Sequence, residues 1–288
     1  MSATASDRST SGMSEGRPRA RVKSFNRRGG RMARNFDVIM AEHASEYVLD
    51  FPRGETETQV APESRLDPLS HFGRVAPLIV EIGPGSGEQA VAYAQAHPEV
   101  NLLAIEAWHV GVARVVAHAV RAGVHNIRIV EADAAQALGV LFAPDTQTPD
   151  TQMLLDPLVA ADGVTDADVV RAHEVWTFFP DPWRKKRHHK RRLVQPGFAT
   201  AVAHVLEPGG LWRLATDWDN YAFQIRDVVE ASPYFDNVFA GQNPDPTDDD
   251  PARGGFAPRW EERTMTRFER RGLDAGRSVH DICAQRVA

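Results

Sequence analysis

Short apolar runs alternate with longer amphipathic stretches through the central part of the chain. Residues 78–82 and 101–106 are compact, partly β-branched runs, which predict buried strands. After the second run, Val112, Val115 and Val116 stand at helical spacing and predict an amphipathic helix. Strands that alternate with helices favour an α/β fold with a mainly parallel sheet flanked by helices.

The same pattern places elements along most of the chain. Strands are predicted at residues 78–82, 101–106, 126–130, 174–179 and 211–216, with two later candidates at 235–240 and 264–269. Helices are predicted at residues 32–48, 88–97, 112–120, 134–142, 198–206 and 218–230. Most of these helices fall between two predicted strands, which is the arrangement that parallel strands require of their connections.

The beginning of the chain and one internal stretch depart from this pattern. Residues 1–23 are rich in Ser, Thr and Gly and lack apolar periodicity, so we expect a disordered tail. Residues 24–77 are expected to form a basic N-terminal arm and a linker, and residues 78–288 a single domain. Within that domain, clusters of Pro, Asp and Thr at 143–172 predict a loop insertion.

Charge is unevenly distributed along this chain of 288 residues, whose formal net charge is −6. Eight Lys or Arg and no acidic residue lie within 17–34, and seven Lys or Arg lie within 184–192. Residues 243–250 carry four Asp and no basic residue. The net charge argues against a general nucleic-acid coat, whereas the local basic runs indicate a defined contact surface for a polyanion.

The number of cysteines and the hydropathy of the chain indicate in which cellular compartment the protein is expected. A single cysteine, Cys283, excludes an intramolecular disulfide framework and a multi-cysteine zinc site, and it fits a reducing compartment. No apolar run is long enough for a membrane span, and the N-terminal residues lack the apolar core of a secretory signal. The histidines are scattered and form no metal-binding pattern. We therefore expect a cytoplasmic protein without a bound metal.

Residues 81–87 read Glu-Ile-Gly-Pro-Gly-Ser-Gly and join a predicted strand to a predicted helix. Gly83, Gly85 and Gly87 let the backbone approach a ligand closely, and the helix N-terminus directs N–H groups at it. The dinucleotide fingerprint G-x-G-x-x-G requires another glycine where this chain has Glu88. This departure argues against NAD as the ligand.

Three acidic residues lie at or after the ends of successive predicted strands. Glu106 ends the second strand 19 residues after Gly87, where an acid can accept hydrogen bonds from both hydroxyls of a ribose. Asp133 follows the third strand and can meet an adenine edge, while Glu81 near the end of the first strand can face an amino-acid group. Alternatively, Glu106 and Asp133 are helix N-caps or solvated loop acids.

The stretch that follows the predicted strand 174–179 is unusual. The strand runs into two prolines, each of which pushes the preceding residue out of the helical region. Phe179 and Asp181 are therefore expected to be extended, with Asp181 on a stiff loop where open α/β sheets bind ligands. The basic run that follows is either a solvated surface or an anion-binding surface. A carboxylate beside it suits a nucleic-acid base whose phosphates are gripped nearby, and Trp183 is expected to pack rather than to stack on the base.

Several segments together resemble a known family. Phe-Pro-Asp-Pro-Trp at 179–183 is followed by Lys185 and by His-His-Lys-Arg-Arg at 188–192. Ala-Thr-Asp-Trp stands at 215–218, and Thr-Arg-Phe-Glu-Arg-Arg-Gly stands at 266–272. With the glycine loop and the three acids, these segments resemble the class I S-adenosylmethionine-dependent methyltransferases, and among them the bacterial tRNA (guanine-N7)-methyltransferase family.

The resemblance covers residues 24–48 and 78–286. It implies a Rossmann-like class I fold with a seven-stranded sheet, S-adenosylmethionine as cofactor, tRNA as substrate and guanine 46 of the variable loop as target. It implies that Asp181 is catalytic and that the cofactor is contacted by Glu81, Gly83, Gly85, Gly87, Glu106, Asp133 and Asp181. It implies that the tRNA is held by Lys185, Asp217, Thr266, Arg267, Phe268 and Glu269. Arg267 departs from the family, which commonly has Lys there, and the insertion 143–172 is longer than the resemblance leads us to expect.

Two alternatives remain open at this point. The first is a methyltransferase for another RNA base or for a small molecule, although a small substrate needs no basic run such as 184–192. The second is a non-catalytic RNA-binding protein on a methyltransferase fold, against which the intact acids Glu81, Glu106 and Asp133 argue. Cofactor binding separates the enzyme from the binding protein, and analysis of the modified nucleoside identifies the base. Both a monomer and a homodimer are compatible with the sequence.

Overall fold

The computed structural model describes residues 23–25, 34–143, 169–242 and 253–287. Most of the predicted tail, most of the insertion 143–172 and the acidic segment 243–250 lie outside these residues. In the described part of the chain, no helix has the length and apolar character needed to cross a membrane.

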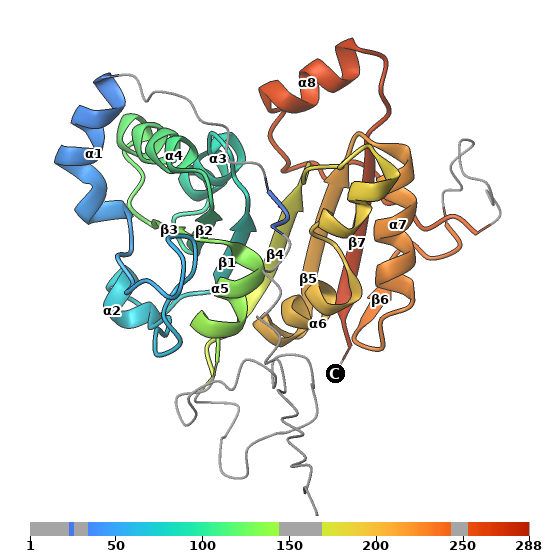
Figure 1. The fold of residues 1–288 in the computed structure, drawn as a ribbon, viewed down its shortest axis with the longest axis horizontal. Helices are drawn as coiled ribbons and strands as arrows, with labels where there is room; N and C mark the ends of the chain where they lie inside the picture. The colour runs from blue at the N-terminus through green and yellow to red at the C-terminus, as the bar shows by residue number, and fades with distance from the viewer. Residues whose placement is uncertain (1–22, 26–33, 144–168, 243–252, 288) are drawn as a thin grey trace, which may run out of the picture.

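A seven-stranded sheet forms the centre of the molecule (Figure 1). Its strand order is β3-β2-β1-β4-β5-β7-β6, and the strands are β1 (Leu78–Ile82), β2 (Asn101–Glu106), β3 (Ile127–Glu131), β4 (Ala172–Phe178), β5 (Leu206–Thr216), β6 (Phe235–Asn237) and β7 (His280–Arg286). Strands β1 to β5 pair in parallel, whereas β7 is antiparallel to both of its neighbours. The predicted α/β fold with a mainly parallel, seven-stranded sheet is confirmed.

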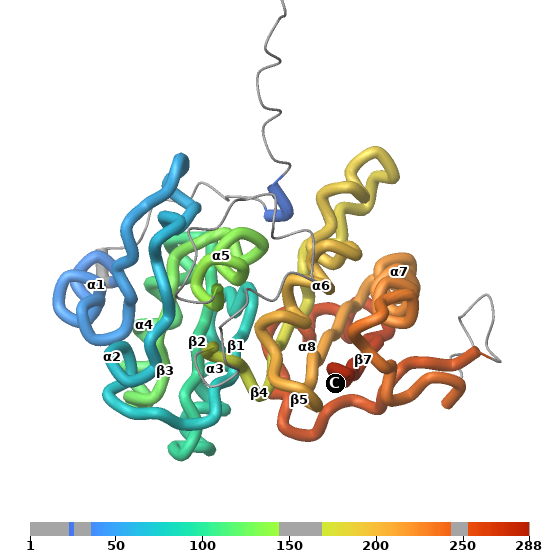
Figure 2. Tube along the Cα trace, turned by 90° about the horizontal axis from the view of Figure 1, so that it is seen from below, coloured from blue at the N-terminus to red at the C-terminus, as the bar shows by residue number. Residues whose placement is uncertain are grey.

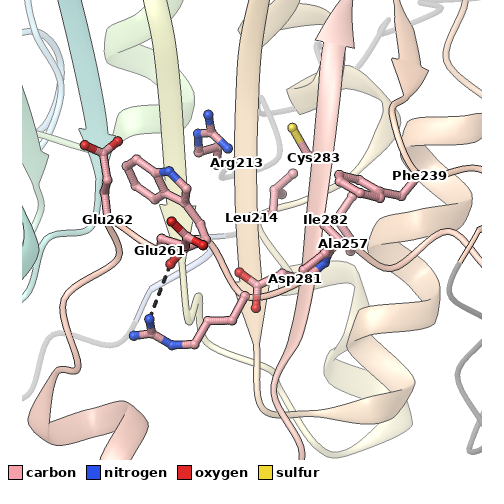
Figure 3. A pocket seen from close by; sticks show the side chains of 12 residues that line it. Arg213, Leu214, Phe239, Ala257, Glu261, Glu262, Asp281, Ile282 and Cys283 are labelled. Atoms are coloured by element: carbon pink, nitrogen blue, oxygen red, sulfur yellow. Dashed lines mark hydrogen bonds between the residues drawn. The ribbon is translucent and has the colours of Figure 1, made fainter.

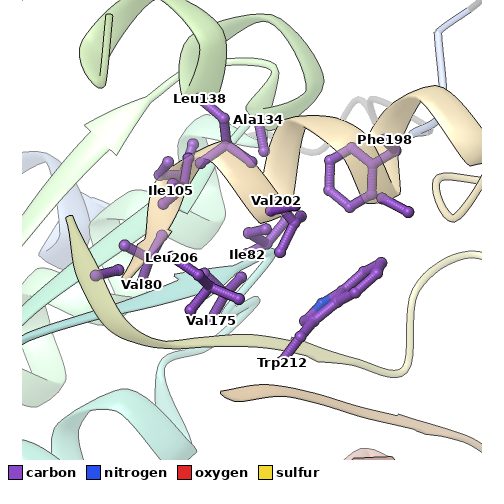
Figure 4. Close-up of a cluster of buried hydrophobic side chains, with 14 of the residues drawn as sticks. Val80, Ile82, Ile105, Ala134, Leu138, Val175, Phe198, Val202, Leu206 and Trp212 are labelled. Atoms are coloured by element: carbon purple, nitrogen blue, oxygen red, sulfur yellow. The ribbon is translucent and has the colours of Figure 1, made fainter. Parts of the chain in front are cut away.

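Helices cover both faces of the sheet, and the alternation of side chains along each strand explains how. One face carries α1 (Arg34–Tyr47), α3 (Glu88–Ala96) and α4 (His109–Ala122), and the other carries α5 (Ala134–Leu141), α6 (Pro196–Val205) and α7 (Asp219–Glu230). Val80 and Ile82 of β1 pack in the cluster with α5 and α6, where Phe198 and Trp212 also lie (Figure 4). Ile79 packs in the cluster on the opposite face. Burying each such aliphatic side chain stabilises the fold by about 1.5–3 kcal/mol.

The residues between α1 and β1 are fastened to the side of the sheet where β3 and α5 lie. The N–H of Leu66 donates to the carbonyl of Leu141 at 2.8 Å. The side chain of Gln136 bonds both the N–H and the carbonyl of Val60, at 3.0 and 2.9 Å. A short helix, α2 (Pro68–Phe72), follows and is capped by the side chain of Asp67. These contacts hold the expected linker against the α/β domain.

The late part of the chain differs from the prediction. The strand predicted at 264–269 is wrong, because Thr266 caps the helix α8 (Arg267–Asp274), with its side chain accepting the N–H of Glu269 at 3.1 Å. The last strand is β7, and the strand predicted at 235–240 is limited to β6. Thr264 and Thr266 favour a strand by their β-branching, but a threonine three residues before a glutamate is also a signal for a helix start. Here the capping interaction decides the local structure.

Candidate functional site

The ends of the parallel strands meet at one edge of the sheet, and α8 stands beyond them (Figure 1). β1 lies between β2 and β4, at the point where the order of the strands reverses. Loops that follow the strands at such a point form the usual ligand site of an open α/β sheet. The candidate residues at this edge come from the loops after β1, β2, β3, β4 and β5 and from α8.

The loop between β1 and α3 is shaped by its three glycines. Gly83, Gly85 and Gly87 have φ angles of +68°, +60° and +75°, which residues with a side chain rarely adopt. No described atom lies within 4 Å of the position that a Cβ would take at Gly83 or Gly85, so these positions border open space. At Gly87 a Cβ would lie 2.9 Å from a methyl group of Val115. The loop therefore leaves room for a ligand outside while its last residue packs tightly on α4.

Glu106, at the end of β2, is hydrogen-bonded to the glycine loop. Its carboxylate accepts the N–H of Gly85 at 3.0 Å and the N–H of Trp108 at 2.8 Å. The side chain is 9% exposed, and burial raises the pKa of Glu106. Gly111 makes this approach possible, because a Cβ there would lie 2.9 Å from both the Glu106 Cγ and the Gly85 carbonyl. We did not predict Gly111 as a site residue, because it lies one residue before the predicted helix 112–120 and no sequence pattern marks its close packing.

Glu81 lies deeper, near the end of β1, and is 4% exposed. Within the described part of the chain, its Oε2 has no hydrogen-bond partner. Burial, together with the nearby charge of Glu106, raises the pKa of Glu81 to about 8. An acid buried without a charge partner is costly, so this position fits a cationic group of a ligand. Two buried acids beside the loop disfavour the diphosphate of a dinucleotide.

Asp133 acts as a helix N-cap, which is one of the two alternative roles given above for this residue. It is the N-cap of α5, where its Oδ1 accepts the N–H of Ala135 at 3.2 Å. Its own N–H donates to the carbonyl of Thr58 at 2.7 Å, so the segment before β1 also holds this residue. A capping role and contact with an adenine edge are compatible, because a carboxylate has lone pairs for several hydrogen bonds.

The loop after β4 is strained at Phe179. The prediction of an extended Phe179 is wrong, because its φ is +52°, in the left-handed region that bulky residues avoid. Its N–H donates to the carbonyl of Ala215 at 2.7 Å, and its ring lies 5.3 Å from the ring of Phe268 and 5.4 Å from the guanidinium of Arg263. Such a conformation costs on the order of 1–3 kcal/mol and persists only where its surroundings hold it. Asp181, two residues after this left-handed position, is half-buried.

Trp183 packs against the protein, as expected. Its Nε1 donates to the carbonyl of Ser24 at 2.9 Å, and the guanidinium of Arg191 lies 3.6 Å from the centre of its ring. Arg191 also donates to the carbonyl of Lys23 at 3.1 Å. Figure 2 shows the segment 23–25 in blue beside the segment after β4 in yellow. Residues 23–25 of the basic run 17–34 thus contact the segment that follows Asp181.

The basic run has both solvated and structural members. Lys186–Arg191 form a short 3-10 helix, η3, and Lys185, Arg187 and Lys190 are exposed. Arg192 is 2% exposed and donates to the Pro182 carbonyl, to Asn220 Oδ1 and to Gln224 Oε1 at 2.7–2.9 Å. Arg192 therefore ties η3 to α7, and the exposed side chains are those available to an anion.

The remaining predicted substrate residues also fall into two groups, those engaged in contacts within the protein and those exposed to solvent. Asp217 is 6% exposed and forms an ion pair with Arg277 at 3.0 Å, without hydrogen-bond geometry. Glu269 is buried and pairs with Arg259 and Arg263 at 2.9 and 3.0 Å. Thr266 is occupied as the cap of α8, whereas the side chains of Arg267 and Phe268 are exposed. Arg277 and Arg263 were not predicted, since the sequence separation of each from its acid gives no signal of the pairing.

A cavity of about 500 Å³ lies elsewhere, between β5, β7 and the segment 257–262 (Figure 3). Arg213, Cys283, Asp281 and Glu262 are among its lining residues. Its described lining comes from neither the glycine loop nor the loop that carries Asp181, so we do not assign it to the cofactor. Among the described residues, no group of three or more His, Cys, Asp or Glu side chains is arranged to hold a metal ion.

Comparisons with known proteins agree with this geometry. The chain matches the Methyltransf_4 family of methyltransferases over residues 75–148 and 169–282. It is 45% identical to a tRNA (guanine-N(7)-)-methyltransferase of Cutibacterium acnes, over 94% of this chain and 85% of that protein. It is 37% identical to a protein of the same name from Nocardioides, over 94% of this chain and 90% of that protein.

Among solved structures, the 16S rRNA methyltransferase KamB is similar at a TM-score of 0.44 and 12% identity, over 75% of this chain and 91% of that one. The relatives named above are far closer in sequence, and the chain covers most of their length. With the seven-stranded sheet and the family match, the predicted class I methyltransferase fold is confirmed. This chain belongs to the tRNA (guanine-N7)-methyltransferase family.

Proposed function

We propose that this chain transfers a methyl group from S-adenosylmethionine to N7 of a guanine in tRNA. The observation that carries the proposal is the juxtaposition, at one sheet edge, of a loop suited to a cationic cofactor with Asp181 and the exposed cations of 185–190. The names of the relatives, 45% and 37% identical to this chain, support the same activity.

The residues at the glycine loop fit the cofactor. The unpaired Oε2 of Glu81 suits the ammonium group of the amino-acid part, and Gly83 and Gly85 leave open space above the backbone. The Glu106 carboxylate suits ribose hydroxyls, and the Asp133 carboxylate suits an adenine edge. When bound, the cofactor supplies a methyl group activated by a positively charged sulfur. The protein contributes binding, orientation and electrostatics.

The chemistry at the base needs little from the protein. N7 of guanine is an acceptor that carries no proton, so transfer does not require a general base to begin. Methyl transfer from a bound cofactor would leave a positive charge on the guanine ring. We assign Asp181 to this charge, because a carboxylate on a constrained loop stabilises it without reorganising. Asp181 can also contact the cofactor from the same position.

The tRNA is held by positioning contacts and by groups near the base. Lys185, Arg187 and Lys190 are exposed and suit phosphates, which fix orientation without specifying sequence. We assign Arg267 and Phe268 to the neighbourhood of the base, and Asp217, Thr266 and Glu269 to the support of that neighbourhood.

Finer assignments belong to the same proposal. The target is guanine 46 of the variable loop, as the family resemblance implies. The enzyme acts in the cytoplasm as a monomer or a homodimer. Residues 1–23 are its tail, 24–77 its arm and linker, and 78–288 its catalytic domain, with the insertion at 143–172.

The direct test is incubation with methyl-labelled S-adenosylmethionine and an unmodified tRNA transcript, followed by nucleoside analysis. We expect labelled 7-methylguanosine. A transcript with 7-deazaguanine at the target lacks the attacking nitrogen and should bind without accepting a methyl group. Label on that transcript, or on another base, would contradict the assignment of N7.

A further inference from the structure

The first two residues of α3 reach across the site to the segment before α8. The Glu88 carboxylate accepts the N–H of Arg267 through Oε2 at 2.7 Å. The next residue, Gln89, accepts the N–H of Thr264 at 2.5 Å and donates to the carbonyl of Glu262 at 3.2 Å. Two consecutive side chains thus bind three backbone groups of the segment 262–267.

These side chains directly follow the glycine loop in the chain. Gly87 precedes them directly and packs against Val115 so closely that a Cβ would not fit. Gln89 is buried, and Ser86 in the loop donates to Oε1 of Glu88 at 3.3 Å. The Glu88 carboxylate is therefore bonded on one side by the loop and on the other by the start of α8.

α8 depends on such contacts because little of it is buried. Only Glu269 and Gly272 of its residues are buried. The N–H of Glu269 is capped by Thr266, and the N–H of Arg267 is one of the helix-start donors that lack a partner inside the helix. Glu88 satisfies this donor, and its negative charge also lies at the favourable end of the helix dipole.

We propose that Glu88 is a positioning residue that couples the cofactor loop to α8, so that the cofactor and the tRNA favour each other's binding. The inference rests on the proposed function, in which the loop holds the cofactor and Arg267 and Phe268 face the base. A ligand on the loop fixes Ser86 and Glu88, which then hold the start of α8 in the position that the substrate requires. Because coupling between two sites is reciprocal, tRNA also tightens cofactor binding through the same contact.

The test compares the full-length parent with Glu88→Ala, Glu88→Gln and a charge-matched control, Glu42→Ala, whose side chain is exposed on α1. In Glu88→Ala we expect cofactor affinity without tRNA to stay within about twofold, and the KM for tRNA to rise about tenfold with little change in kcat. Tightening of the cofactor by tRNA, measured by calorimetry, should be lost in that variant. Glu88→Gln keeps an acceptor oxygen and should restore most of the coupling, and Glu42→Ala should match the parent.

Hydrogen exchange gives a second readout that does not require turnover. The amide of Arg270 donates to the carbonyl of Thr266 inside the first turn of α8. S-adenosylmethionine alone should slow exchange of this amide in the parent and in Glu88→Gln, but not in Glu88→Ala. Equal slowing in all variants, or an unchanged KM in Glu88→Ala, would overturn the proposal. If the parent transfers no methyl group to tRNA, the proposed function fails, and the exchange experiment still decides whether Glu88 couples the loop to α8.

Discussion

Glu81 is the acid whose chemistry depends most on its surroundings, since burial and the charge of Glu106 raise its pKa to about 8. An unfolded chain releases this proton near pH 4.5, so between pH 4.5 and 8 the folded protein binds one proton more than the unfolded chain. The free energy of unfolding of the ligand-free protein should therefore fall as pH rises from 6 to 8, by at most about 1.4 kcal/mol per pH unit. Denaturant unfolding at several pH values measures this, and Glu81→Gln should give a flatter profile. Parallel profiles would show that Glu81 titrates normally.

The raised pKa of Glu81 also predicts that a proton is released when the cofactor binds. A cationic group favours the ionised carboxylate, so binding at pH 7 should expel up to one proton, and affinity should rise with pH until about 8. Calorimetry in buffers of different ionisation enthalpy counts the protons released. Glu81→Gln should bind more weakly and release none. A parent that also releases none would place the cation away from Glu81.

Asp181 is expected to act on the rate rather than on binding. Asp181→Asn keeps the shape of the side chain and removes its charge, which matters most when positive charge develops on the base. We expect kcat to fall about a hundredfold or more, with tRNA affinity little changed, in single-turnover and binding measurements. Near-normal single-turnover rates together with a lower unfolding free energy would instead show that Asp181 only supports its loop.

At the residue scale, the sequence predicts where an acidic residue lies in the fold more reliably than it predicts which residue the acid pairs with. Glu81 and Glu106 could be placed at one sheet edge because each lies near the end of a predicted strand. The pairing of Asp217 with Arg277 depends on where α8 and the chain after it come to rest, which no local pattern reports. The left-handed Phe179 likewise depends on contacts from remote residues, and the proline rule alone predicts the opposite.

At the scale of elements, two substitutions in and next to η3 distinguish a role in folding from a role in RNA binding. Arg192→Ala removes hydrogen bonds from a buried guanidinium and should lower the free energy of unfolding by about 2–3 kcal/mol. Lys190→Ala changes an exposed side chain and should alter stability by less than about 0.5 kcal/mol. It should, however, reduce the salt dependence of tRNA binding by a slope of about one. Salt titrations with equal slopes for Lys190→Ala and the parent would mean that the run is only a solvated surface.

The sequence predicts helices and strands well where hydrophobic periodicity is strong. It predicts them poorly where a side-chain contact determines the local structure. Each of the five parallel strands overlaps a predicted apolar run, which forms a strand because helices bury both faces of the sheet. β5 begins five residues before the predicted strand, at Leu206. α8 is short and mostly exposed, so it has no apolar stripe to reveal it. Its sequence signal is Thr266, a helix-capping residue that stands three positions before Glu269.

On the scale of the whole molecule, a net charge of −6 coexists with two basic runs, 17–34 and 184–192, and the carbonyl of Lys23 in the first accepts from Arg191 in the second. The acidic remainder of the protein repels a polyanion, while the basic surfaces attract it, so the charge distribution restricts how tRNA can approach. The carbonyl of Ser24 accepts from Trp183 and the carbonyl of Lys23 accepts from Arg191, so the described residues 23–25 lie on the segment that follows Asp181. Residues 23–25 therefore lie beside the loop of the proposed catalytic residue.

Truncation of the arm tests its contribution to tRNA binding. Deleting residues 1–20 should leave tRNA kinetics near those of the parent, because Lys23 and Ser24 remain. Deleting residues 1–33 removes seven of the eight basic residues of 17–34 but preserves α1, and it should raise the KM for tRNA, most strongly at low salt. Trp183→Phe keeps a ring for Arg191 but cannot donate to the Ser24 carbonyl, so it separates docking of the arm from its charge. If this variant behaves like the longer deletion, docking matters most, and if it behaves like the parent, charge does. Parent-like kinetics of the longer deletion at low salt would contradict a role of the arm in binding tRNA.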